Sequence, residues 1–216
     1  MTANQVPHEK VYVHRAFVRV FHWVNALGMT LMIMSGWRIY NASPLFEFKF
    51  PNEITLGGWL GGALQWHFAA MWLLVINLLI YVIVGFATGH FRKRFTPVSP
   101  SSVVADMAKA LKGKLPHITT TYNAVQKASY IGVLLAIILA IVSGSVVWKP
   151  VQLQELAVLI GGYEGARLVH FFSMAAICAF IVLHLILVLL VPSTLLPMIM
   201  GWVRKSKHQP EASHEH

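Results

Sequence analysis

Four long stretches of the chain are almost entirely apolar, and most polar and charged residues lie in the segments between them. The stretches cover about residues 16–40, 63–86, 125–148 and 167–191. At about 1.5 Å per residue, each is long enough to cross the ~30 Å hydrocarbon core of a bilayer as one helix. The pattern predicts an all-α bundle of four transmembrane helices, forming a single domain over residues 1–216.

The connecting segments differ in character. Residues 41–62 are rich in Phe, Pro and Gly, which predicts a flexible connection lying against one membrane face. Residues 87–124 form a long basic loop, and apolar residues at helical spacing predict a short helix on the membrane surface within 102–112. Residues 192–216 follow the last helix and predict an amphipathic tail.

The distribution of charge predicts the orientation of the helices. Of the 216 residues, 56% are hydrophobic and 12% are charged, about half the charged share of a soluble domain. Thirteen of the seventeen Lys and Arg lie before the first helix, between the second and third, after the last, or, for Arg19 and Lys127, in a helix's first turn beside these segments. This asymmetry places both termini in the cytoplasm of a bacterial inner membrane. The net charge of +9 is therefore a topology signal and not a nucleic-acid footprint.

Cysteine usage excludes several kinds of redox site. Cys178 is the only cysteine of the chain. One thiol permits no intrachain disulfide, no CxxCH haem attachment and no iron–sulfur cluster held by four cysteines. Cys178 is therefore interpreted as a small apolar packing residue.

Four histidines interrupt the apolar helices, where an imidazole is costly unless it has a partner or a function. His170 and His184 are fourteen residues apart, so they share one face of the fourth helix about 21 Å apart along its axis. Because successive helices alternate in direction, His22 lies at the cytoplasmic depth of His184. His67 lies at the outer depth of His170 by the same reasoning. Depth therefore predicts two pairs, each from two helices.

Two imidazoles at one depth suit haem iron, because the porphyrin supplies the other four ligands. Zinc usually takes three or four protein ligands, and no Cys, Asp or Glu lies at these depths. We therefore predict two b-type haems in the bundle core, with the four histidines as axial ligands of the iron. Met71 and Met174 follow His67 and His170 by four residues, which leaves a His/Met ligand pair open beside the packing role favoured for both methionines.

Other residues are candidates for supporting roles. Haem propionates need cations, and the candidates are Arg19 on the cytoplasmic side and Arg38 and Arg167 on the outer side. Topology alone also explains arginines at these positions. Small residues such as Gly28, Gly36 and Gly144 would let a macrocycle approach the helices.

An ordered set of short motifs resembles one family of membrane proteins over nearly all of residues 10–205. The set comprises Arg19-x-x-His22-Trp23, His67 near the start of the second helix, Tyr122-Asn123-x-x-Gln126-Lys127, Ser143-Gly144 followed by Trp148-x-Pro150, and the His170/His184 spacing. It resembles the bacterial cytochrome b561-like membrane anchors. These include formate dehydrogenase gamma subunits, Ni-Fe hydrogenase b-type cytochromes and thiosulfate reductase cytochrome b subunits. A Ser-Gly pair preceding Trp also recurs in the first and third helices.

The resemblance implies a di-haem cytochrome b that carries electrons between a periplasmic redox partner and the membrane quinone pool. Candidate partners are a hydrogenase, a molybdenum oxidoreductase or a cytochrome c. The resemblance also implies a quinone pocket beside the cytoplasmic haem at Asn123, with Gln126 and Lys127 as neighbours. An ordinary helix start capped by Asn123 is the alternative interpretation of that motif.

Two other functions stay open at this point. Some stand-alone relatives of the family are thought to act as superoxide:quinone oxidoreductases, which would make the chain an enzyme by itself. Alternatively, a haem-free transporter or scaffold would use the histidines as a proton relay. The direction of electron flow, the quinone type, the haem potentials and a homodimeric state are not determined by the sequence.

Overall fold

The structure, a computed structural model, describes residues 8–88 and 124–206 of the chain. Its four long helices are α1 (Ala16–Ala42), α2 (Leu60–Ala87), α5 (Ala124–Trp148) and α7 (Gly162–Leu190). All four contain a stretch long and apolar enough to span a membrane, so the prediction of four such helices is confirmed. The surface helix expected within 102–112 lies outside the described residues.

Two of the helices begin earlier along the chain than the apolar pattern indicates. α2 starts at Leu60, just after Gly57 and Gly58 have turned the chain with positive φ angles of 108° and 70°. α7 starts at Gly162, after Gly161 in the left-handed conformation, and Glu164 lies in its first turn. An acidic side chain there interacts favourably with the helix dipole, so the polar residues before the apolar run also become helical.

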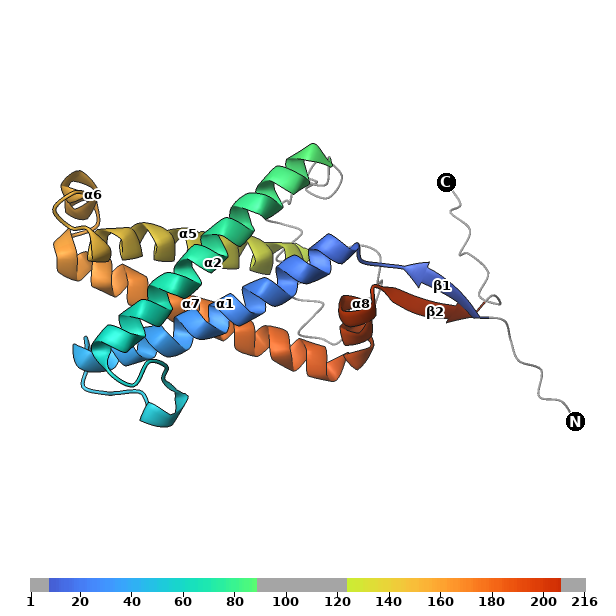
Figure 1. Cartoon of the computed structure of the whole chain (residues 1–216), viewed down its shortest axis with the longest axis horizontal. Coiled ribbons are helices and arrows are strands. Elements are labelled where there is room, and N and C mark those ends of the chain that lie inside the picture. The colour runs from blue at the N-terminus through green and yellow to red at the C-terminus, as the bar shows by residue number, and fades with distance from the viewer. Residues whose placement is uncertain (1–7, 89–123, 207–216) are drawn as a thin grey trace, which may run out of the picture.

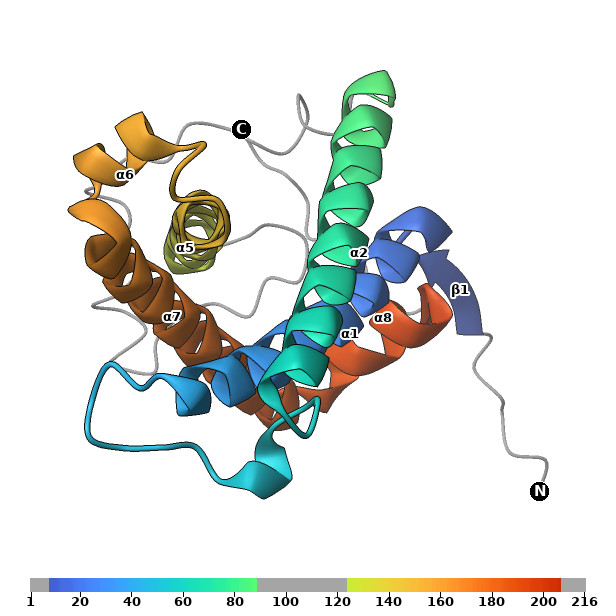
Figure 2. The same cartoon turned by 60° about the vertical axis from the view of Figure 1, so that its left-hand side comes forward.

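The four helices are arranged as two pairs, α1 with α2 and α5 with α7 (Figure 2). In the first pair, Gly28 allows close approach, because a Cβ at that position would lie 2.7 Å from Leu74 Cδ2. Gly28 therefore makes room for the neighbouring helix, and its role toward a macrocycle stays a prediction. Asn77 also joins this pair, donating from Nδ2 to the Phe21 carbonyl at 3.2 Å.

Few large side chains are buried within the protein itself. In the most apolar part of each long helix, only 11–17% of the residues are buried. Large apolar side chains such as Phe86, Leu189 and Leu190 are more than 70% exposed. A helix surface of this kind is stable against lipid tails and would not be stable in water. The chain is therefore a multi-pass membrane protein.

One end of the bundle carries a two-stranded ribbon and is called the strand end here (Figure 1). Strand β1 (His8–Tyr12) pairs antiparallel with β2 (Trp202–Ser206), after the short helices η2 (Pro192–Thr194) and α8 (Leu195–Met200). The amphipathic tail expected from residue 192 onward is thus partly strand. The first and last described elements, β1 and β2, thus lie at the same end of the bundle, as an even number of spans requires.

The opposite end consists of the connection between α1 and α2, with η1 (Asn52–Ile54), and of α6 (Gln154–Leu159) (Figure 1). The sequence predicted a flexible connection, but hydrogen bonds hold it. The Arg38 guanidinium donates to Asn52 Oδ1 and to the Gly58 carbonyl. The Leu56 N–H donates to the Met34 carbonyl at 3.0 Å. The glycine-containing loop is therefore folded back against α1.

Candidate haem sites

The four intramembrane histidines lie in two pairs of facing rings. The ring centroids of His22 on α1 and His184 on α7 are 6.1 Å apart, and those of His67 on α2 and His170 on α7 are 6.3 Å apart. These are the same pairs that helix depth predicts. The first pair lies toward the strand end and the second toward the opposite end. The role of the four rings as iron ligands stays a prediction.

The separation within each pair suits one metal ion. A coordinating nitrogen lies about 1.2 Å from the centre of its ring, and a metal–imidazole bond is about 2.0 Å long, so two imidazoles on opposite sides of one metal have centroids about 6.4 Å apart. Both observed separations agree with this value. Within the described residues no group of three or more His, Cys, Asp or Glu could hold a metal ion. The paired rings therefore fit haem iron better than zinc.

A serine and a glycine from the preceding helix lie against each ring of the pair at the opposite end. Ser35 Oγ is 3.0 Å from Nδ1 of His67, and a Cβ on Gly36 would lie 3.4 Å from the same ring. Ser143 Oγ is 3.4 Å from Nδ1 of His170. The contacts of these serines and glycines with the histidines were not predicted. The Ser-Gly pair that recurs in the first and third predicted helices is the feature of the sequence that indicates them.

The other pair has aromatic neighbours instead. The indole ring of Trp23 lies 5.3 Å from the ring of His22, edge to face. The ring of Phe180 stacks on His184 at 6.1 Å with an interplanar angle of 8°. Within the described part of the chain, no hydrogen bond to a ring nitrogen of His22 or His184 is observed. The two sites thus differ in their surroundings.

The three arginines expected near propionates make hydrogen bonds or ion pairs with other residues of the chain. Arg19 donates from Nη1 to the Ile199 carbonyl at 2.5 Å, which fastens α8 to α1. Arg38 holds the loop at the opposite end, as described above. Arg167 pairs with Glu164 at 3.0 Å and donates to the Ser43 carbonyl at 2.5 Å, joining α7 to the end of α1. Their role toward propionates stays a prediction.

The remaining candidates are only partly accessible to description. Asn123 lies outside the described residues, and Gln126 and Lys127 lie in the first turn of α5 with side chains that are not described. The thiol of Cys178 donates a hydrogen bond to Sδ of Met174, with the two sulfurs 3.5 Å apart. Since the ring of His170 faces His67, this contact supports the packing role of Met174 over the His/Met alternative.

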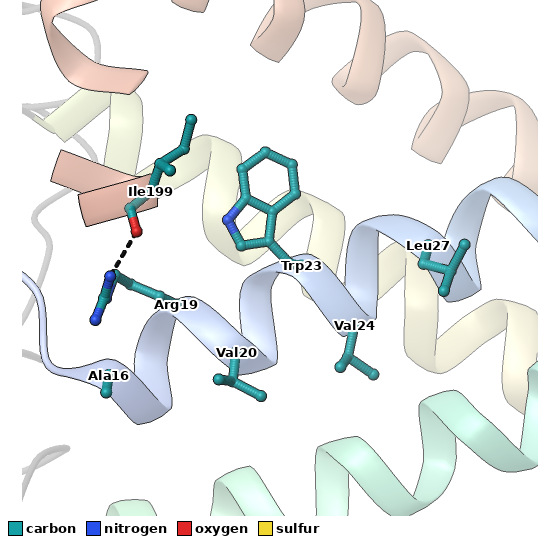
Figure 3. A pocket seen from close by; sticks show the side chains of 7 residues that line it. All are labelled: Ala16, Arg19, Val20, Trp23, Val24, Leu27 and Ile199. Atoms are coloured by element: carbon teal, nitrogen blue, oxygen red, sulfur yellow. Dashed lines mark hydrogen bonds between the residues drawn. The ribbon is translucent and has the colours of Figure 1, made fainter. Parts of the chain in front are cut away.

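A shallow apolar groove of about 470 Å³ lies along α1 at the strand end, between that helix and α8 (Figure 3). Its lining is apolar except for Arg19 and the indole N–H of Trp23, and comprises Ala16, Arg19, Val20, Trp23, Val24, Leu27 and Ile199. Trp23 donates from Nε1 to the Met198 carbonyl at 3.3 Å, and the same indole ring lies beside His22. The groove is therefore one side chain away from the histidine pair of the strand end.

Comparison with known proteins identifies the family of the chain. Residues 13–201 match the family described as prokaryotic cytochrome b561. The chain is 52% identical over 190 residues to a protein of Azospira oryzae named as a protein-methionine-sulfoxide reductase subunit, YedZ1, covering 88% of this chain and 96% of that one. It is 22% identical over 197 residues to the formate dehydrogenase cytochrome b556(fdo) subunit of Escherichia coli K12, covering 89% and 86%.

A shorter match involves a protein of Rhodobacter capsulatus named as a Ni/Fe-hydrogenase B-type cytochrome subunit. It is 38% identical over 60 residues, covering 28% of this chain and 22% of that one. The family match extends over all four long helices and both histidine pairs. The chain therefore belongs to the prokaryotic cytochrome b561 family, whose members are membrane proteins that carry b-type haem and transfer electrons.

Proposed function

We propose that the chain is a di-haem subunit that carries electrons across the inner membrane, between the quinone pool and a periplasmic redox subunit. The two pairs of facing imidazoles support this most directly, because the ring separation in each pair is that of two imidazoles bound to one metal ion. His22 and His184 would hold one haem, and His67 and His170 the other. Haem b bound at each pair would supply one-electron exchange at two depths of the membrane.

Helix α7 sets the distance between the two sites because it contributes a histidine to each. Fourteen residues of regular helix separate His170 from His184, a rise of about 21 Å. The partner rings come from α1 and α2, which are packed together. The spacing of the two sites is thereby fixed by one rigid element, and the apolar helices exclude water from the path between them.

The proposed orientation places the strand end in the cytoplasm. Thirteen of the seventeen basic residues lie at the termini, in the connection between α2 and α5, or in the first turns of α1 and α5 that adjoin these segments, and four lie in or near the other two connections. The pair His67/His170 then lies toward the periplasm, where a redox subunit would dock. The pair His22/His184 lies toward the cytoplasm.

The relatives suggest a reductase as the partner. The relative with 52% identity over nearly its whole length is named as a subunit of a protein-methionine-sulfoxide reductase. Reduction of a sulfoxide to a thioether consumes two electrons and two protons and releases water. Oxidation of a quinol to a quinone supplies two electrons and two protons. The proposed direction is therefore outward, from quinol at the strand end to the reductase.

The groove along α1 is the first candidate for the quinone site. It is open on one side and its walls are apolar. The single N–H of Trp23 already donates to the Met198 carbonyl, so Arg19 is the polar side chain that would meet a quinone oxygen. A quinone has the same combination of an apolar tail and a polar ring. Trp23 lies between the groove and His22, so a quinone head there would be close to the histidine pair. The segment at Asn123 predicted from the sequence is the second candidate for this site.

The experiment uses the chain in membranes together with its native partner subunits. Addition of a quinol should reduce the haems, as followed by their absorbance spectrum, and subsequent addition of methionine sulfoxide should reoxidise them. The His170→Ala variant is the control, because it should still accept electrons from quinol but fail to pass them to the sulfoxide. Failure of quinol to reduce the wild-type spectrum would contradict the proposal. Reduction of quinone by superoxide with the chain alone would instead support the stand-alone enzyme.

A further inference from the structure

The two histidines at the opposite end have the same surroundings, built twice from different helices. In the first copy, Ser35 and Gly36 on α1 lie against the ring of His67 on α2. In the second, Ser143 and Gly144 on α5 lie against the ring of His170 on α7. Each copy is one of the two helix pairs of the bundle. Both serines are at most 1% exposed, so water does not compete for their hydroxyl groups.

The direction of the hydrogen bond between each serine and its histidine follows from a backbone carbonyl that the serine also contacts. Ser35 Oγ donates to the Leu31 carbonyl at 2.6 Å, and Ser143 Oγ donates to the Leu139 carbonyl at 2.6 Å. A hydroxyl has one hydrogen, and in both cases the helix carbonyl four residues earlier receives it. The hydroxyl oxygen is therefore left as an acceptor for the N–H at Nδ1 of the facing histidine.

The hydrogen bond at Nδ1 determines which nitrogen is available to a metal. Nδ1 of His170 also lies 2.9 Å from the Ala140 carbonyl, which can only accept. A proton must therefore occupy Nδ1, and Nε2 retains its lone pair. Hydrogen bonding at the far nitrogen orients a ligating imidazole and makes it more basic. His22 and His184 have no such hydrogen bonds among the described residues.

We propose that Ser35 and Ser143 are positioning residues that lower the reduction potential of the haem at His67/His170 relative to the haem at His22/His184. The proposal rests on the proposed function, because it takes these four histidines as axial ligands. A more basic imidazole stabilises ferric over ferrous iron. The two serines thereby separate the potentials of the two sites, which otherwise share the same ligand type.

The test is a potentiometric titration of the purified holoprotein, following the haem absorbance. The variants are Ser143→Ala, Ser35→Ala and the double substitution. Loss of a hydroxyl should raise the potential of one haem, by an amount equivalent to up to about a tenfold change in its reduction equilibrium, or about 59 mV for a one-electron couple. Ser35→Ala should give the larger shift, because His170 keeps its hydrogen bond to the Ala140 carbonyl at 2.9 Å when the Ser143 hydroxyl at 3.4 Å is removed. The potential of the other haem should not change. The double variant should shift further than either single variant.

Two matched controls lie on the same helices. Ser145 Oγ donates to the Ile141 carbonyl at 2.8 Å, and Thr30 Oγ1 donates to the Ala26 carbonyl at 2.8 Å. Both make the same bond within the helix, and neither contacts an imidazole of the described residues. Ser145→Ala and Thr30→Val should therefore leave both potentials unchanged. A Ser143→Thr variant keeps the hydroxyl and should retain the wild-type potential.

The outcomes separate this proposal from the proposed function. If the wild-type protein binds two haems and Ser143→Ala, Ser35→Ala and the double variant titrate like wild type, the positioning role is wrong and the ligand assignment stands. If the potential of the haem at His22/His184 moves instead, the positioning role is also wrong. If the alanine variants lose haem, electron paramagnetic resonance of the ferric haem in Ser143→Thr decides. A wild-type signal there supports the hydroxyl's role, and an altered one contradicts it. A wild-type protein without haem overturns both proposals.

Discussion

Replacement of Gly144 by alanine should weaken the haem site at the opposite end of the bundle. A Cβ at this position would lie 2.9 Å from Cε1 and 3.1 Å from Nδ1 of His170. Ordinary van der Waals contacts of a Cβ begin at about 3.4 Å, so the ring must move by about 0.5 Å. The ring cannot move freely, because the Ala140 carbonyl holds its Nδ1 at 2.9 Å.

The size of the effect follows from overpacking. Insertion of a methyl group into a packed site costs about 1–3 kcal/mol. If the ligand geometry absorbs this cost, haem binding at this site weakens by roughly 5-fold to 150-fold. At Gly36 a Cβ would lie 3.4 Å from Cε1 of His67, at the limit of an ordinary contact. Gly36→Ala should therefore have a smaller effect than Gly144→Ala.

The assay measures haem transfer from the purified protein to an excess of apomyoglobin. A His184→Ala background simplifies the measurement, because only the haem at the opposite end should remain. The control is Gly132→Ala on the same helix, where a Cβ would have no atom of the described residues within 4 Å. Both substitutions replace a helical glycine by alanine, and this replacement by itself stabilises the helix by about 1 kcal/mol. Equal haem loss in Gly144→Ala and Gly132→Ala would refute the reasoning.

Three further predictions test the sites and the packing. Substitution of His184 by alanine should remove one haem per chain and leave the spectrum of the other unchanged, and His170→Ala should remove the other; loss of both haems from either variant would contradict the pairing. Asn77→Leu should lower the Tm of the detergent-solubilised protein, because it removes an interhelical hydrogen bond worth about 1 kcal/mol, and an unchanged Tm would show that this bond contributes nothing. Val20→Phe should raise KM for quinol with both haems retained, because Val20 lines the groove. Ile83→Phe, at a similarly exposed helix position outside the groove, should leave KM unchanged. Equal KM values for the two variants would exclude the groove as the quinone site.

The histidine pairs could be predicted because they depend on regular periods. Helix length fixes the depth of a residue, and the alternation of helix directions then fixes which residues meet. His22 and His184 are 162 positions apart in the sequence, yet only two facts were needed to bring them together. These facts were the helical rise and the number of crossings. Neither depends on details of side-chain packing.

The features that were not predicted depend on contacts between distant or irregular segments. The ribbon joins residues 8–12 to 202–206, and no local pattern of either segment specifies its partner. Arg19 was expected near a propionate because it is a cation beside a histidine, but its contact with Ile199 depends on where α8 folds back. The contact between Ser35 and His67 could not be predicted from the sequence, because it depends on which face of α1 packs on α2.

The central claim is tested most directly by the amount of haem b bound per polypeptide, measured on the purified wild-type protein with a reduced-minus-oxidised spectrum. Two facing imidazole pairs, at 6.1 Å and 6.3 Å, predict two haems per chain with low-spin spectra. One haem per chain would mean that one histidine pair is structural. A protein without haem after expression in haem-replete cells would contradict the electron-transfer function altogether.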